Sequence, residues 1–220
     1  MLFNSPEFLL LFLPVALAGH ALLMPRSAEA GVWWLVACSL AFYGAWDVTF
    51  LPVIVTSLLG NFALSRIMER CAGRAWRRAL IGLGLIANLG ALGVYKYSGF
   101  LAASINAATA AGLPVPEIVL PVGISFFTFQ QIAFLVDSYR GTAIERSFSR
   151  YLLFITFFPQ LIAGPIVHHR EMMPQFAGTR GLRADDIAAG LTMLAIGLVK
   201  KIVIADTVAT PASAVFASTA

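Results

Sequence analysis

The chain has 220 residues, of which 59% are hydrophobic and only 12% charged, and its mean hydropathy is +0.83. A soluble globular domain of this length does not need so much apolar side chain, so the composition predicts an all-α polytopic membrane protein in a lipid bilayer. The net charge of +4 comes from basic residues clustered between apolar blocks, as in cytoplasmic loops. Nucleic acid is therefore excluded as a partner.

Six apolar blocks are the predicted transmembrane helices: residues 8–24, 32–46, 51–67, 80–99, 118–139 and 187–208. No Lys or Arg precedes the first block, so we predict an uncleaved helix with a periplasmic N-terminus rather than a signal peptide. All Lys and Arg except Lys96, Lys200 and Lys201 then fall in loops on the cytoplasmic side. Residues 100–117 have no Lys or Arg and are predicted to form an outer loop.

The segment 151–176 begins as apolar as a membrane helix, but Pro159 and the Gly164-Pro165 pair interrupt it. Broken backbone at membrane depth is tolerated only where protein or a water-filled cavity surrounds it. We therefore predict a re-entrant segment that lines an intramembrane cavity and is enclosed by unbroken helices. Gln160 lies between the breaks and is a candidate cavity-lining residue.

The predicted fifth span carries polar residues on two of its faces. At 100° per residue, Gln130 and Asp137 share one face, while Thr128 and Gln131 share another. A helix that is polar on two faces does not suit a position facing lipid. Gln130, Gln131 and Asp137 either form interhelical hydrogen bonds or line a substrate path.

Lys200 and Lys201 lie inside the predicted sixth span. Lys200 is about 20 Å along a path of about 30 Å, where a charged residue is a candidate for function. Both lysines are candidate cavity-lining residues, and snorkelling to the outer interface is the alternative. Asp206 lies five residues beyond Lys201 and about 140° round the helix, so it is predicted to be a poor partner.

His168 and His169 are the most obvious candidates for a general base. Neighbouring residues on a regular element point apart, so the two are not expected to form one site. Arg170 and Glu171 follow directly, and this pattern indicates a solvated loop. We predict no catalytic role for this pair.

Four segments together resemble the membrane-bound O-acyltransferases, and within them the branch of alginate O-acetyltransferase membrane subunits. They are MLFNSPEFLLLFLP at 1–14, LPVGISFFTFQQIAFLVDSYRG at 120–141, FFPQLIAGPIVHHREMMPQF at 157–176 and GLVKKIVIAD at 197–206. The resemblance covers essentially the whole chain, in the same order. It implies part of a multi-helix inner-membrane enzyme built around a central pore.

The resemblance also implies an activity. Such an enzyme moves an acetyl group from a cytoplasmic donor, acetyl-CoA, toward hydroxyls of an exported polysaccharide, alginate, often through a periplasmic acetyltransferase or another polysaccharide-modification partner. Family members are about twice this length, and their catalytic His, usually after a Trp, lies in the C-terminal half. No Trp-His pair occurs here. We therefore expect an N-terminal fragment forming a single membrane domain, inactive alone, with neither a catalytic residue nor a metal site.

Other functions remain open at this point. Within the same family, the acceptor could be another exopolysaccharide or peptidoglycan, or the reaction could be D-alanyl transfer to teichoic acid. Outside it, broken helices and intramembrane charges are also features of transporters and channels, although a transporter should show internal repeats of its spans. A purely structural subunit is the third alternative.

Overall fold

The computed structural model describes residues 2–109, 111–142, 145–161, 164, 167, 169–176 and 183–218. All regular elements in these ranges are helical, as the composition predicts. Contacts within the chain divide it into two units, one formed by Met1–Gly31 with Thr179–Ala220 and the other by Val32–Gly178. Each unit is described by itself.

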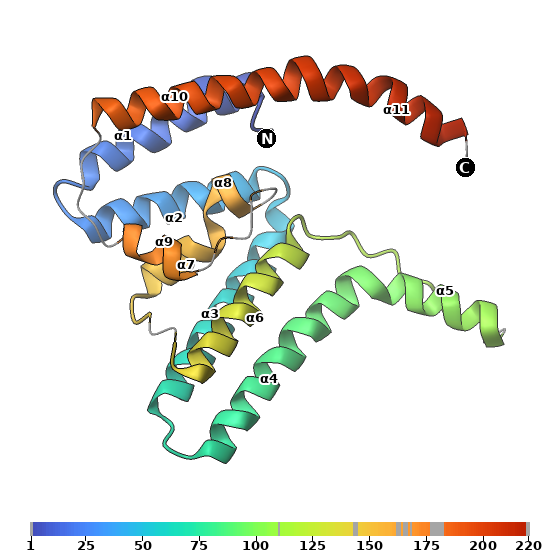
Figure 1. The fold of residues 1–220 in the computed structure, drawn as a ribbon. Helices are drawn as coiled ribbons and strands as arrows, with labels where there is room; N and C mark the ends of the chain where they lie inside the picture. Colours follow the sequence, from blue (N-terminus) through green and yellow to red (C-terminus); the bar gives the residue numbers. More distant parts are fainter. Residues whose placement is uncertain are drawn as a thin grey trace. The chain divides into compact units, whose positions relative to one another are not determined.

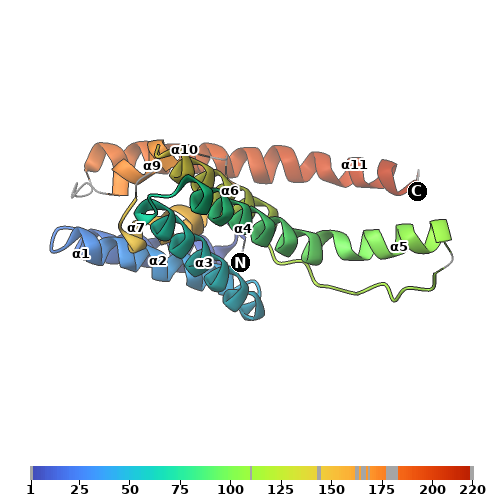
Figure 2. The same ribbon diagram turned by 90° about the horizontal axis from the view of Figure 1, so that it is seen from below.

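Three helices of the second unit form a bundle. Figures 1 and 2 show α3 (Leu51–Arg70), α4 (Arg74–Leu92) and α6 (Ile124–Arg140) lying side by side. α4 approaches its neighbours closely at Gly84, where a Cβ atom would lie 2.7 Å from Leu135 Cδ1. Small residues permit such close packing of helices in a membrane. A side chain at position 84 would collide with Leu135, so the close packing of α4 on α6 depends on glycine there.

The ends of these helices follow from local sequence. α6 begins after Gly123, whose φ is 73°, and ends at Gly141, whose φ is 74°; glycine adopts this left-handed conformation without the cost that a side chain brings. The short connection before α3 contains Asp47, whose carboxylate accepts a hydrogen bond from Thr49 N–H at 2.8 Å. The hydrogen bonds from Thr49 hold the pKa of Asp47 below its usual range. Gly123 and Gly141 thus set the two ends of α6, and Asp47 caps the short turn that leads into α3.

The predicted re-entrant segment is broken, as Pro159 indicates. It forms α7 (Phe148–Thr156), α8 (Phe158–Leu161) and α9 (His169–Phe176). All residues of 149–156 except Arg150 are buried, and the Tyr151 ring packs against those of Phe62 and Phe134. The segment is therefore part of the apolar core of the second unit, and the Pro165 and His168 positions lie outside the described residues.

The break between α7 and α8 exposes a backbone N–H that helix α2 (Ala28–Gly44) satisfies. The Phe158 N–H donates to Ser39 Oγ at 3.2 Å, and the same hydroxyl donates to the Leu35 carbonyl at 2.7 Å. Ser39 is fully buried. An unbroken helix thus provides the shelter that broken backbone requires in an apolar environment.

In the first unit, the N-terminal helix consists of η1 (Phe8–Phe12) followed by α1 (Leu13–Leu23). Its C-terminal part is one continuous helix made of α10 (Ala184–Val199), η4 (Lys200–Ala205) and α11 (Asp206–Ser218). No described residue in the most apolar stretch of the C-terminal helix is buried, and large apolar side chains such as Met193 and Val203 are exposed. Apolar exposure along a long helix is what a lipid environment accommodates.

Helix lengths support the membrane assignment, while the number of spans remains a prediction. Among the described residues, three helices are long and apolar enough to cross a membrane: Val48–Arg70, Arg74–Thr109 and Ala184–Ser213. The apolar helix Phe8–Leu23 in the predicted first span is shorter. The helices in the predicted second and fifth spans, α2 and α6, have 17 residues each.

Two predicted boundaries are wrong. Residues 100–109, predicted as loop, are helical, because α4 continues through η3 (Gly93–Tyr97) into α5 (Ser98–Thr109). This stretch contains several Ala and no Pro, so its helix propensity outweighs the charge pattern that indicated a loop. Conversely, residues 118–123, predicted as helix, are not helical, because Pro121 restricts the residue before it and Gly123 starts α6.

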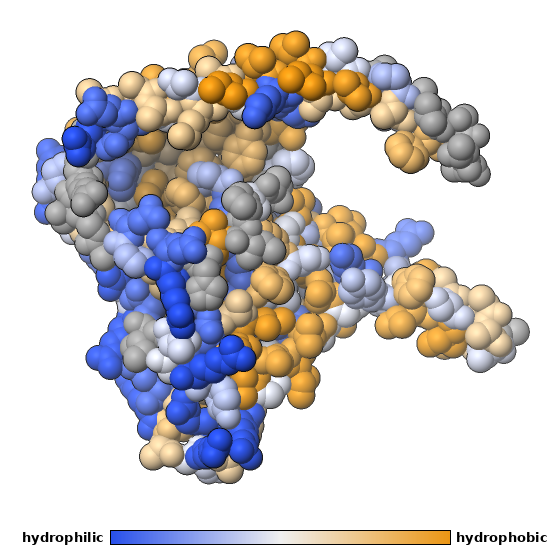
Figure 3. All heavy atoms as spheres, in the orientation of Figure 1, coloured by the Kyte–Doolittle hydropathy of each residue, from blue (hydrophilic) through white to orange (hydrophobic). Residues whose placement is uncertain are grey.

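Hydrophilic and hydrophobic residues occupy different regions of the surface of the second unit. In Figure 3, hydrophilic residues gather at the end of the bundle where α3 passes into α4, and hydrophobic atoms cover the α4 side. Ile86, for example, is 72% exposed. The polar end contains the arginine cluster predicted to lie in the cytoplasm.

Replacing Ser39 by Ala should destabilise the protein, because it removes the hydroxyl that accepts the hydrogen bond from the buried Phe158 N–H. We expect a loss of about 1–2 kcal/mol in the free energy of unfolding. The measurement is reversible denaturation in detergent micelles, followed by circular dichroism. Ser98→Ala, which removes an exposed hydroxyl bonded to the carbonyl of Val94 in its own helix, is the matched control and should change little. Equal effects of both substitutions would contradict the proposed role of Ser39.

Candidate functional site

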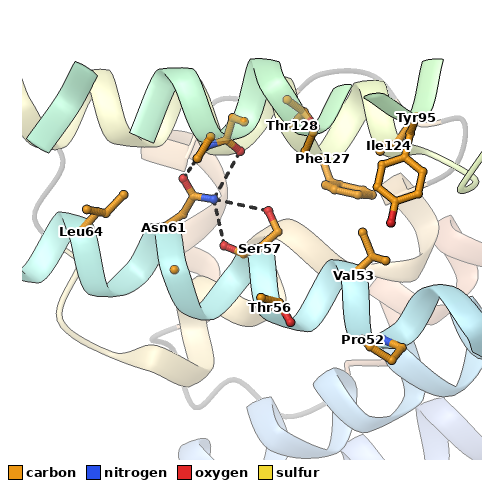
Figure 4. Close-up of a pocket in the computed structure, with 14 residues that line it drawn as sticks. Pro52, Val53, Thr56, Ser57, Asn61, Leu64, Tyr95, Ile124, Phe127 and Thr128 are labelled. Atoms are coloured by element: carbon orange, nitrogen blue, oxygen red, sulfur yellow. Dashed lines mark hydrogen bonds between the residues drawn. The ribbon is translucent and has the colours of Figure 1, made fainter. Parts of the chain in front are cut away.

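A partly open cavity of about 500 Å³ lies between α3, α4 and α6 (Figure 4). Most of its wall is apolar, and each of the three helices contributes at least one polar side chain. The lining residues are Pro52, Val53, Thr56, Ser57, Gly60, Asn61, Leu64, Ala87, Asn88, Ala91, Tyr95, Ile124, Phe127 and Thr128. A cavity of this size and composition is typical of small-molecule sites.

A cluster of side-chain amides joins the three helices beside this cavity. Asn88 Nδ2 of α4 donates to Asn61 Oδ1 of α3 at 2.6 Å, and Asn61 Nδ2 lies 3.3 Å from Asn88 Oδ1. Gln131 Oε1 of α6 accepts from Ser57 Oγ at 3.0 Å and also from Asn61 Nδ2. All three amide residues are buried. We call Ser57, Asn61, Asn88 and Gln131 the amide cluster.

The amide cluster explains one polar face of α6. Gln131 makes the interhelical hydrogen bonds that were one of its two predicted roles, and Thr128 lines the cavity on the same side of the helix. Buried polar groups must be hydrogen-bonded to avoid a desolvation cost. The cluster meets this requirement for most of its atoms and fixes how α3, α4 and α6 fit together.

The other polar face of α6 meets the broken segment. Asp137 Oδ2 lies 3.6 Å from His169 Nδ1 at the start of α9, and both side chains are largely buried. Gln130, on the same face, lines a smaller cavity together with His169. The predicted sharing of a face by Gln130 and Asp137 is therefore confirmed.

The prediction of a solvated loop at His169 is wrong. His169 is only 5% exposed and lies in a helix, with the rings of Phe134 and Phe154 against it. The charged residues that follow it indicated solvent, but Met172 and Met173 of the same helix anchor this face in the core. His168 lies outside the described residues.

The remaining candidate residues lie in both units. Gln160 is buried in α8 of the second unit, where its backbone carbonyl accepts from Gly164 N–H at 3.0 Å. Lys200 and Lys201 are exposed on η4 of the first unit. The amide cluster was not predicted from the sequence. The signal that could have revealed it is the presence of two polar residues, Ser57 and Asn61, four positions apart and therefore on one face of an apolar helix.

Asp206 does pair with Lys201, contrary to the prediction. Lys201 Nζ donates to Asp206 Oδ1, and the Asp206 N–H bonds to the Lys201 carbonyl. The cause is the π-helical turn Lys200–Ala205, in which the hydrogen bonds run from i to i+5. Residues five apart, which point in different directions on an α-helix, come to nearly the same side on this wider turn.

A group of ion pairs lies where α3 ends, at the predicted cytoplasmic side. Glu69 accepts from Arg66 and pairs with Arg146 at 2.8 Å, and Glu145 pairs with Arg150 at 3.2 Å. The Arg77 guanidinium donates to the Tyr139 carbonyl at 2.5 Å. These contacts connect the end of α6 with the start of α4, and the loop after α6 with the end of α3 and the start of α7.

Comparisons with known proteins agree with this architecture. Residues 145–220 match the membrane-bound O-acyltransferase family. The chain is 39% identical to the peptidoglycan O-acetyltransferase of Helicobacter pylori, over 95% of this chain and 45% of the relative. It is 37% identical to the protein named "Probable alginate O-acetylase AlgI" of Pseudomonas aeruginosa, over 99% of this chain and 42% of the relative.

A more distant relative is the teichoic acid D-alanyltransferase of Bacillus subtilis, 25% identical over 70% of this chain and 43% of the relative. The chain spans less than half the length of these relatives. No solved structure matches it.

The fold and the polar core are those of an all-α membrane protein with a cavity inside its helix bundle. Residues 145–220 match the membrane-bound O-acyltransferase family, and nearly the whole chain is similar to a part of the alginate O-acetylases that spans less than half of their length.

The amide cluster makes a quantitative prediction. Asn61→Leu should lower the free energy of unfolding by about 1–2 kcal/mol, because Asn88 and Gln131 lose partners inside the bundle. The double variant Asn61→Leu with Asn88→Leu should cost less than the sum of the two single variants, with a coupling of roughly 0.5–2 kcal/mol. Denaturation of the four proteins of this cycle in one detergent measures it. Strict additivity would show that the two amides do not interact.

Proposed function

We propose that the gene product transfers an acetyl group from cytoplasmic acetyl-CoA to hydroxyls of an exported polysaccharide, and that alginate is the acceptor. The support is the resemblance to O-acetyltransferases along nearly the whole chain. We further propose that it acts in the inner membrane, with a periplasmic N-terminus and a periplasmic modification partner. The catalytic His that the resemblance implies is assigned to no residue of this chain.

The observation that carries this proposal is the burial of both polar faces of α6. In an apolar protein, Gln130 and Gln131 are each no more than 2% exposed, and each lies beside a cavity or its polar wall. Transfer of an acetyl group across a membrane requires a polar route enclosed by protein, and α6 supplies polar groups on two sides. We propose that Gln130, Gln131, Asp137 and Gln160 contribute to this route.

Peptidoglycan is the second candidate acceptor. The observation that favours it is the peptidoglycan O-acetyltransferase that shares 39% identity with the chain, compared with 34–37% for the alginate O-acetylases. Both acceptors present a sugar hydroxyl outside the membrane, so the same transfer chemistry serves either. The relatives favour an acyltransferase over the transporter alternative.

The acceptor can be identified by expressing the complete gene product in a host that lacks its own O-acetyltransferases and makes both polymers. Base-labile acetate is then measured separately on purified exopolysaccharide and on purified peptidoglycan. We expect acetate on the exopolysaccharide, with none from cells carrying the empty vector. Acetate on peptidoglycan alone would assign the second acceptor, and acetate on neither would contradict O-acetyl transfer to these polymers.

We propose separately that Lys200 has the cavity-lining role that its sequence position predicts. In the complete gene product, Lys200→Met should reduce acetyl transfer roughly tenfold, equivalent to about 1.4 kcal/mol of lost transition-state stabilisation, without loss of folded protein. Polymer-bound acetate and the amount of protein in the membrane are measured together. Arg26→Met, which removes a cation from a predicted loop, is the control. Unchanged activity would leave Lys200 as a residue that snorkels to the interface.

A further inference from the structure

A hairpin projects from the second unit at the end of α4 that lies away from the arginine cluster. α4 continues through η3 into α5, and Figure 1 shows α5 turning away from the line of α4. Residues 111–120 return along α5 and are held by Asn106. Its Nδ2 donates to the Leu113 carbonyl at 2.8 Å, and its Oδ1 accepts from the Leu113 N–H at 2.7 Å. We call residues 98–109 and 111–120 the outer hairpin.

The helix that leads into the outer hairpin is too long to cross a bilayer in a straight line. Arg74–Thr109 is one apolar helix of 36 residues, which is about 54 Å at a rise of about 1.5 Å per residue. A hydrocarbon core of about 30 Å would hold it only at a tilt of about 56°, whereas transmembrane helices tilt by about 0–40°. The helix bends instead, near the π-helical turn Gly93–Tyr97. α5 therefore does not continue straight through the core.

The bend lies at the level of a membrane interface. Lys96 follows Arg74 by 22 residues, or about 33 Å of helix, so it lies about one hydrocarbon thickness from the arginine cluster. Its Nζ atom is 5.4 Å from the centroid of the Tyr97 ring and 3.4 Å from Ser125 Oγ. Tyrosine and lysine suit membrane interfaces because each combines an apolar body with a polar tip. The outer hairpin thus begins at the interface that is predicted to be periplasmic.

The surface of the outer hairpin is apolar. No residue of α5 is buried, and Phe100, Leu101 and Val119 are 69%, 53% and 70% exposed. Glu117 is the one charged residue in the hairpin sequence. An apolar surface of this kind is unfavourable in water and marks a place where a protein contacts a membrane or another protein. The outer hairpin therefore needs an apolar partner.

The backbone of the return segment limits how deep the outer hairpin can lie. Residues 111–120 have no regular secondary structure, so their N–H and C=O groups depend largely on water. Irregular backbone that faces lipid does not occur within the hydrocarbon region. The side chains favour lipid while the backbone requires water, and the interfacial layer of the membrane provides both.

We propose that the outer hairpin lies in the outer interface of the membrane, with Phe100, Leu101 and Ile105 inserted among the lipids. The lipid surface is then its binding partner. Leu101 and Ile105 lie on one side of α5, away from Asn106 and the return segment. The hairpin holds the outer end of α4 at a fixed depth, close in sequence to Tyr95, which lines the larger cavity. The inference uses the membrane class of the protein and is independent of the acyl-transfer reaction.

Spin labels test this position in the complete gene product, reconstituted into vesicles of phosphatidylethanolamine and phosphatidylglycerol. Leu101→Cys and Ile105→Cys are made in a background without native cysteines, and each cysteine is labelled with a nitroxide. Collisions with oxygen, which concentrates in lipid, and with a water-soluble nickel chelate are then measured. Both labels should collide mainly with oxygen, at a depth of about 5–10 Å into the boundary between headgroups and acyl chains.

Two exposed positions outside the outer hairpin are the matched controls. Ile86→Cys, on the hydrophobic side of α4, should show more oxygen and less nickel contact than the hairpin labels. Ala72→Cys, in the arginine cluster, should show mainly nickel contact. Phe100→Cys supplies another hairpin position if one of the first two variants does not fold.

Each other outcome overturns the inference. Nickel contact at the hairpin labels equal to that at Ala72→Cys would show that the hairpin extends into water. Little contact with either reagent would show that protein covers it, from the rest of the gene product or from a partner. A depth equal to that of Ile86→Cys would place the hairpin within the hydrocarbon core.

Discussion

The burial of polar side chains on two different faces of α6 is the constraint on which the second unit depends. One face is satisfied by the amide cluster, which joins α3, α4 and α6 through Asn61, Asn88 and Gln131. The other face meets the broken segment through Asp137 and His169. In an apolar environment an unsatisfied amide is costly, so neither face can turn toward lipid. The neighbours of α6 must therefore surround it, and this requirement places the two cavities inside the protein.

The broken segment obeys the same rule through its backbone. Proline interrupts the helix, and the N–H of Phe158 that the break releases is taken up by Ser39 of α2. α7 is buried in the aromatic core, and α9 brings His169 to Asp137. A segment that could not remain one continuous helix is thus kept inside the protein by apolar packing, by the hydrogen bond to Ser39 and by the Asp137–His169 pair. Because the segment is broken, it can turn back and bring His169 against α6, which a straight helix could not do.

The polar groups around α6 are divided between two cavities. The larger cavity has a polar wall whose atoms largely bond to one another, which stabilises the bundle. The smaller one is lined by Gln130 and His169 among aromatic side chains, on the face of α6 that meets the broken segment. Gln130 and Gln131, which belong to these two faces, are separated by one step of about 100° around the same helix.

The sequence by itself determined the all-α membrane class, the interruption near Pro159, the two polar faces of α6 and the resemblance to O-acyltransferases, because these depend on composition, local backbone chemistry, helical periodicity and long motifs. Only the tertiary structure showed that His169 is buried against Asp137, that Asn61 and Asn88 meet Gln131, and that Ser39 completes the break. Each of these contacts joins residues far apart in the chain, which no local pattern specifies. The pairing of Lys201 with Asp206 is local, yet it too was missed, because it requires a π-helical turn where the sequence indicated a regular α-helix.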